Sequence, residues 1–287
     1  MKNIVIPTDF SELSLKGLEL ALLMTKETKA KIELVHVLKK AENMSFKQED
    51  IKTDQVNQTF DSLLKQTKKK HPDEKLSYTI KEGKIQNKVT NVASSKKDSV
   101  IVTSTHGASG WEELFTGSNA YKIVAAAERP VFTVRGKEIP NQIRKIVLPL
   151  DTTLETREKV PFTMQLAELF NAEVHIVSVS KSDIDEVKSK LADYKAQVNH
   201  YLSDHNIKTT TDDITGDNLT DITIEYAKKV DADLISIMTE QEKDVKNILL
   251  GSYAHQMINK SPVPVLLYPT KQIGKITESF RTLGIKY

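Results

Sequence analysis

Short apolar runs alternate along this chain with stretches in which apolar residues recur every three or four positions. The runs, such as Ile4–Ile6 and Val100–Val102, have the character of buried strands. The periodic stretches, such as the one that places Leu15, Leu18 and Leu22 on one face, predict amphipathic helices. Strands that alternate with helices and are apolar almost throughout indicate a mostly parallel sheet covered on both faces, and hence an α/β fold.

The same pattern occurs twice, because segments of the first half recur in the second half. Asn3–Asp9 matches Lys145–Asp151 at an offset of 142 residues, and Gly117–Ser118 matches Gly251–Ser252 at an offset of 134. An internal repeat of this length predicts two domains of one fold. The difference between the offsets indicates about eight more residues in the first copy, which fits a longer surface segment after its second strand.

The repeat sets the expected domain organisation. We expect a first domain at 1–136, a second at 143–270 and a C-terminal tail at 271–287, with a polar linker between the domains. In each copy the apolar pattern locates four strands and four helices. The last two strands are expected at Ser99–Thr103 and Val131–Val134 in the first copy, and at Asp233–Ile237 and Val263–Tyr268 in the second.

Composition and charge exclude several classes of function. The 287 residues are 39% hydrophobic and 28% charged, which is typical of a folded globular protein. A formal net charge of +2 is too small for a dedicated nucleic-acid binder. The absence of cysteine excludes disulfides, thiolate zinc sites, iron–sulfur clusters and cysteine nucleophiles. The seven histidines never pair at a helical spacing of three or four, so we expect no metal site.

The N-terminal segment does not resemble a secretion signal. Only Ile4–Ile6 is apolar before Pro7 and Asp9 interrupt the run, and no later window approaches 18 uninterrupted apolar residues. We therefore expect a cytoplasmic protein without a membrane segment.

Two loops that follow strands hold the candidate chemistry, because ligands of open parallel sheets bind beyond the carboxyl ends of the strands. Asp9 follows the first strand and precedes a helix, so it is either a helix cap or a carboxylate that accepts hydrogen bonds from a ligand. The segment 103–119 combines hydroxyls, glycines and the start of a helix, which suits either an anion site or an ordinary loop. Neither a P-loop nor a Gly-x-Gly-x-x-Gly motif is present.

These residues resemble the universal stress protein family, here as a tandem of two domains. Nucleotide-binding members have an acid after the first strand and Gly-x2-Gly-x9-Gly-Ser/Thr after the fourth. This chain has Asp9 and Ser104-x2-Gly107-x9-Gly117-Ser118, so Ser104 stands where the pattern has glycine. The resemblance implies doubly wound, Rossmann-like domains with five-stranded sheets in the order 3-2-1-4-5, which pair with each other through their last strands.

The resemblance also implies a ligand. We expect ATP, ADP or AMP, with or without Mg²⁺, in the first domain. The residues expected to hold it are Pro7, Thr8, Asp9, Val37, Thr103, Ser104, His106, Gly107, Gly117, Ser118 and Asn119. In the second copy Met238 and Gln241 occupy the two earlier glycine positions, and the neighbouring acids would repel phosphate, so we expect no nucleotide there and a structural role for Asp151.

The sequence thus favours a stress-associated regulatory or binding protein, with no catalytic residue assigned. Two alternatives stay open. One is an interaction module without a small ligand, and the other is a slow ATPase or self-phosphorylating protein in which His106, Ser109 and Ser118 would be the reactive residues. Pairing of the two domains within the chain is expected, a homodimer and a further protein partner are open, and no nucleic acid is expected.

Overall fold

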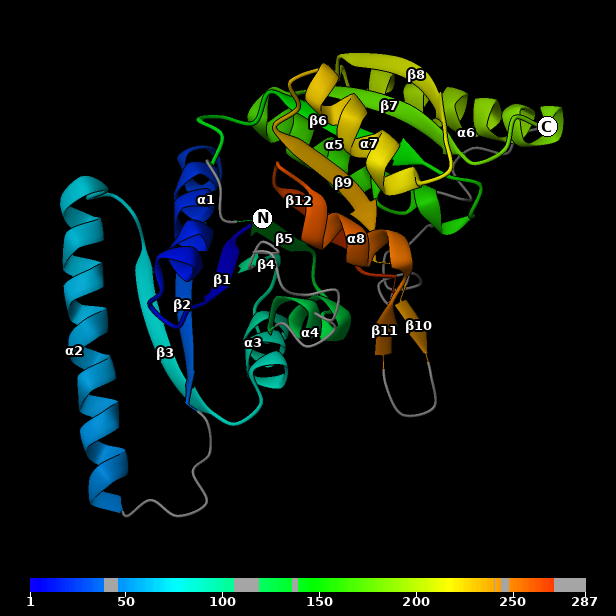
Figure 1. Cartoon of the computed structure of the whole chain (residues 1–287). Helices are drawn as coiled ribbons and strands as arrows, with labels where there is room; N and C mark the ends of the chain where they lie inside the picture. Colours follow the sequence, from blue (N-terminus) through cyan, green and yellow to red (C-terminus); the bar gives the residue numbers. More distant parts are fainter. Residues whose placement is uncertain (39–45, 106–118, 136–138, 240, 244–247, 271–287) are drawn as a thin grey trace.

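The computed structural model shows one 10-stranded sheet that runs through both halves of the chain, together with a two-stranded ribbon (Figure 1). It describes all residues except 39–45, 106–118, 136–138, 240, 244–247 and 271–287, so the expected tail lies outside the described residues. Within the described part of the chain, no helix combines the length and the apolar content that crossing a membrane would require.

The two halves repeat one succession of strands and helices, to which the second half adds η1, β10 and β11. The first half contains β1 (Asn3–Pro7), α1 (Glu12–Thr28), β2 (Lys31–Leu38), α2 (Phe46–Lys70), β3 (Leu76–Glu82), α3 (Ile85–Ser94), β4 (Ser99–Thr105), α4 (Asn119–Ala126) and β5 (Val131–Arg135). The second half contains β6 (Lys145–Leu150), η1 (Glu155–Arg157), α5 (Val160–Phe170), β7 (Glu173–Ser180), α6 (Asp185–Asp204), β8 (Thr209–Thr215), α7 (Leu219–Lys229), β9 (Leu234–Met238), β10 (Gln241–Lys243), β11 (Ile248–Leu250), α8 (Ser252–Lys260) and β12 (Val265–Tyr268).

The sheet order is β3-β2-β1-β4-β5-β12-β9-β6-β7-β8. Each half therefore has the order 3-2-1-4-5, and its neighbouring strands are parallel. The halves meet at β5 and β12, which pair antiparallel with Phe132 opposite Leu266. The α/β class, the strand order and the pairing through the last strands are confirmed.

Two hydrophobic cores lie on opposite faces of the sheet, and each includes residues of both halves. One core packs α1, α2, α5 and α6 against alternate strand residues, among them Ile4, Ile6 and Leu148. The other packs α3, α4, α7 and α8 against the intervening residues, among them Val5 and Val147. The domains thus share both core layers.

Three features differ from the sequence expectations. The third strand of each half, β3 and β8, was not located by the apolar pattern, because both strands lie at the sheet edges and carry many exposed polar residues. Part of the extra length of the first half is helical, since α2 has 25 residues and its counterpart α6 has 20. The antiparallel ribbon of β10 and β11 follows β9, where only a loop was expected.

Replacing Leu266 with alanine will test the seam between β5 and β12. Leu266 is fully buried, so the substitution removes core contacts shared by both halves and should lower the free energy of unfolding by about 2–5 kcal/mol. Urea unfolding followed by circular dichroism measures the change. Leu154→Ala, at a leucine that is 51% exposed, is the control and should cost about 0.5 kcal/mol or less. Equal effects of the two variants would contradict the shared core.

A carboxylate on β2 links three elements of the first half. Glu33 accepts a hydrogen bond of 2.7 Å from the Thr79 hydroxyl on β3 and lies 2.6 Å from the ammonium of Lys96, which follows α3. Partial burial raises the pKa of Glu33, but the hydrogen bonds from Lys96 and Thr79 and the charge of Lys96 outweigh it, so the pKa lies below its usual value.

This lowered pKa predicts a pH-dependent contribution to stability. A depressed carboxyl pKa stabilises the fold fully above the unfolded-state pKa, and the contribution is lost as the pH falls through the folded-state pKa. Glu33→Gln should therefore lower the free energy of unfolding by about 1 kcal/mol at pH 7 and by progressively less below the usual glutamate pKa. Denaturant titrations at pH 7 and pH 3 measure this. Glu19→Gln, which removes an exposed pair with Lys16, is the control, and a pH-independent Glu33 effect would refute the assignment.

Candidate functional site

The candidate site lies where two neighbouring strands of the first half send their following helices to opposite faces of the sheet. β1 and β4 are paired and parallel, so their carboxyl ends lie at the same edge. The helix after β1, α1, packs in one core, and the helix after β4, α4, packs in the other. A topological switch point of this kind is where open α/β sheets bind their ligands.

The loop between β1 and α1 is fixed by its own contacts. Thr8 is 6% exposed, and its hydroxyl lies 3.0 Å from the Ser14 hydroxyl and accepts the backbone N–H of Phe10 at 3.0 Å. Its carbonyl accepts a hydrogen bond of 2.8 Å from Nδ1 of His36 on β2. The Thr8 side chain is thus hydrogen-bonded to the loop and to the first turn of α1.

An aromatic stack holds the same loop from one side. Phe10 has a positive φ of 65°, a conformation that L-residues adopt only when the surroundings impose it. Its ring stacks on His36 with centroids 5.0 Å apart and meets Phe60 of α2 edge-on at 4.7 Å. This packing compensates the backbone strain and fixes the residue next to Asp9.

Asp9 is exposed, as is Ser11, to which it is hydrogen-bonded. Its Oδ1 accepts hydrogen bonds from the backbone N–H and the hydroxyl of Ser11, at 3.1 and 2.6 Å, and Ser11 in turn is the N-cap of α1. Partial burial raises the pKa of Asp9, but the hydrogen bonds from Ser11 outweigh it and leave the pKa below its usual value. Asp9 is therefore an ionised carboxylate that closes a turn through one oxygen.

Three other expected residues lie on one face of the sheet. Strand side chains alternate between faces, and Val5, Val35 and Ile101 all belong to the core that contains α4. By the same alternation that face also holds the residues two positions further along each strand, namely Pro7, Val37 and Thr103. Pro7 and Thr103 are buried, and Val37 is half-buried beside this core.

Ser104 lies within β4, paired in register with Val134 of β5. It is not among the residues with positive φ, so its backbone does not require glycine. Asn119 is exposed and begins α4. The remaining expected residues, His106, Gly107, Gly117 and Ser118, lie outside the described residues, as do Ser109 and the rest of the connection from β4 to α4.

The second half repeats the turn after its first strand but not the later loop. Oδ1 of Asp151 accepts hydrogen bonds from the backbone N–H and the hydroxyl of Thr153, at 2.6 and 2.5 Å, as Asp9 does from Ser11. After β9, where the first half has its glycine pattern, the chain forms the ribbon of β10 and β11. The strand β10 begins at Gln241, the position of the second expected glycine.

Sequence reasoning did not single out two residues beside the site. Thr105 ends β4 and Tyr121 lies in the first turn of α4, and both are hydrogen-bonded to the second half. No local sequence signal identifies them, because their partners are 153 and 129 residues away. In the described part of the chain, no three His, Cys, Asp or Glu side chains gather in a way that could hold a metal ion.

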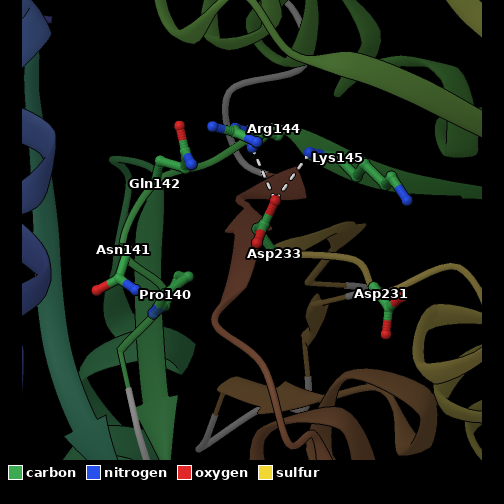
Figure 2. Close-up of a pocket in the computed structure, with 7 residues that line it drawn as sticks. All are labelled: Pro140, Asn141, Gln142, Arg144, Lys145, Asp231 and Asp233. Atoms are coloured by element: carbon green, nitrogen blue, oxygen red, sulfur yellow. Dashed lines mark hydrogen bonds between the residues drawn. The ribbon is translucent and has the colours of Figure 1, made fainter.

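A separate pocket of about 280 Å³ lies at the amino ends of β6 and β9, away from these loops (Figure 2). The Asp233 carboxylate there accepts the backbone N–H groups of Arg144 and Lys145, at 2.7 and 3.0 Å. It therefore serves to fix the end of the linker. The pocket is lined by Pro140, Asn141, Gln142, Arg144, Lys145, Asp231 and Asp233.

Comparison with solved structures agrees with this architecture. A universal stress protein from Archaeoglobus fulgidus superposes with a TM-score of 0.75 at 17% identity, covering 92% of this chain and 97% of that chain. A protein of unknown function from Pseudomonas aeruginosa has a TM-score of 0.61 at 14% identity, covering 95% and 94%. Universal stress proteins in complex with cAMP and with dAMP match 44% of this chain, each with a TM-score of 0.37.

Sequence comparison gives the same family for both halves. A universal stress protein of Methanocaldococcus jannaschii is 29% identical over 139 residues, which are 47% of this chain and 82% of that protein. The model of the universal stress protein family matches this chain twice, at residues 1–135 and 142–269. The chain belongs to the universal stress protein family, as a tandem of two of its domains.

Proposed function

We propose that this protein is a stress-associated regulatory protein whose first domain binds an adenine nucleotide: ATP, ADP or AMP, with or without Mg²⁺. The observation that supports this best is that the residues of the nucleotide pattern lie at the end of, or after, the two strands that form the switch point. Asp9 and the motif from Ser104 to Ser118 fit the nucleotide pattern of the family apart from Ser104. Asp9 follows β1 and Ser104 lies in β4, the two strands that meet at the switch point.

In this proposal the exposed carboxylate of Asp9 accepts hydrogen bonds from a ribose hydroxyl or an amine of the ligand. One oxygen is already oriented by Ser11, and the lowered pKa keeps the group ionised at neutral pH. Pro7, Val37 and Thr103 share one face of the sheet and would border the base. Gly107, Gly117, Ser118 and the start of α4 at Asn119 would supply N–H groups to the phosphates, with His106 beside them.

Two arguments favour a different role for the second domain, which we infer binds no nucleotide. The ribbon of β10 and β11 follows β9 in place of a glycine loop, and strand pairing engages backbone groups that a phosphate would need. Glu240, Glu242 and Asp244 also bring negative charge to this segment, which opposes phosphate binding. The cytoplasmic location, the homodimer and a further protein partner stay predictions.

Analysis of the purified protein for bound nucleotide tests the proposal directly. Heat-denatured protein should release about one adenine nucleotide per chain, or titration with ATP should saturate at about one site, because only the first domain holds the pattern. Gly117→Val, which adds a branched side chain where the backbone would approach the phosphates, should abolish retention without a matching loss of Tm.

The same assay and an incubation with labelled ATP distinguish the alternatives. No released nucleotide and no heat with millimolar ATP would contradict the proposal and favour an interaction module. Turnover of labelled ATP, or label transferred to the protein, would instead indicate the slow ATPase or self-phosphorylating protein.

The two equivalent aspartates provide a matched pair of variants. Asp9→Asn keeps an oxygen for the turn with Ser11 but removes the charge, and should weaken ATP binding about 10- to 100-fold, the range for a charge-assisted hydrogen bond. Asp151→Asn makes the same change in the second domain and should leave affinity unchanged. Calorimetric titration at pH 7 measures the ATP affinity of both variants. Equal losses of affinity would mean that the Asp9 substitution acts on the structure of the protein and not on a contact with ATP.

A further inference from the structure

Two hydrogen bonds join the candidate site to the second domain. The hydroxyl of Thr105, the last residue of β4, donates to the carbonyl of Ile258 in α8 at 3.3 Å. The hydroxyl of Tyr121, in the first turn of α4, accepts the backbone N–H of Leu250 at 3.2 Å. These contacts therefore lie at the two described ends of the connection between β4 and α4.

The second domain presents both ends of one helix to these residues. Leu250 ends β11 just before α8 begins at Ser252, and Ile258 lies in the last turn of α8. The last carbonyls of a helix have no hydrogen-bond donor within the helix, and the Thr105 hydroxyl is the donor to one of them, that of Ile258. β11 packs against α4 at the junction of the halves (Figure 1), and α8 reaches α4 through the contact of His255 with Tyr121.

The contact between α4 and α8 joins equivalent positions of the two halves. Tyr121 and His255 occupy equivalent positions at the offset of 134, and their rings meet edge to face, with centroids 5.2 Å apart at 90°. Each half thus contributes the same helical position to the junction. Both halves keep the Gly-Ser pair before this position, but only the first half also has the earlier part of the nucleotide pattern, with Gly107 where the second half has Gln241.

These two hydrogen bonds are buried, so breaking either of them is costly. Tyr121 and Leu250 are each 7% exposed, and Thr105 and Ile258 are 2% exposed, so water cannot readily replace the lost partners. A shift of α4 or of the end of β4 would leave buried polar groups unpaired, which is costly. The first turn of α4 and the end of β4 are therefore held at fixed positions relative to α8.

We propose that the second domain acts as a built-in positioning element, holding the end of β4 and the start of α4 in the arrangement that nucleotide binding needs. Tyr121 and Thr105 are its positioning residues. The inference rests on the proposed function, and it gives the domain without the nucleotide pattern a role in the site of the other.

Tyr121→Phe tests the proposal, because it keeps the ring against His255 and removes only the hydroxyl. ATP affinity should fall about 3- to 10-fold, the effect of one neutral hydrogen bond. Thr105→Val should weaken binding to a similar extent. Tyr226→Phe is the matched control, since Tyr226 is also a buried tyrosine whose hydroxyl is hydrogen-bonded, to His175 within the second domain. It should leave affinity unchanged.

Amide hydrogen exchange of α4 provides a readout that needs no nucleotide. In Tyr121→Phe the amides of 119–126 should exchange about 10-fold faster than in Tyr226→Phe, because local opening becomes easier. Unchanged exchange in both variants would overturn the positioning role, and faster exchange with unchanged ATP affinity would overturn its link to binding. If the wild-type protein binds no nucleotide, the proposed function fails, and the exchange rates alone decide whether the second domain holds α4.

Discussion

The antiparallel pairing of β5 with β12 is the interaction on which the rest of this structure depends. Without it each half would end in an apolar strand with a row of unpaired backbone groups, a surface prone to aggregation. With it, two five-stranded sheets become one, and the helices on each face pack into a layer that continues across the junction. The same pairing brings α4 against β11 and Tyr121 against His255 of α8, so the candidate site borders the second domain.

Much of this architecture could be predicted, because central strands of a parallel sheet are apolar on both faces. β1, β4 and their counterparts are short apolar runs, and the repeat identified them twice. β3 and β8 escaped prediction because each has only one neighbouring strand. β8 reads Thr-Thr-Thr-Asp-Asp-Ile-Thr, with nothing apolar to bury except Ile214. The ribbon strands, three residues each, are too short for any periodicity.

The site was partly predictable for a related reason. Sequence position alone placed Asp9 after a strand and before a helix, but it left open whether the carboxylate caps a turn or faces a ligand. The structure shows that Oδ1 closes the turn with Ser11, while the nucleotide role stays a proposal. Thr8 likewise stays a predicted ligand residue, and the sequence did not reveal that its hydroxyl is hydrogen-bonded to Ser14 and Phe10. The roles of Thr105 and Tyr121 depend on the direction in which two distant strands pair, which no local pattern encodes.

The linker between β5 and β6 gives the junction a further property. If the two domains were separate chains, the fraction that pairs would depend on their concentration. If those chains were identical, each would also have to keep the features of both domains. A short tether instead raises the effective concentration of one partner at the other to about the millimolar range, whatever the amount of protein. Assembly of the two unlike halves is then independent of dilution. The second domain can therefore lack the glycines of the pattern, form the ribbon of β10 and β11 instead, and still pair with β5 of the first domain.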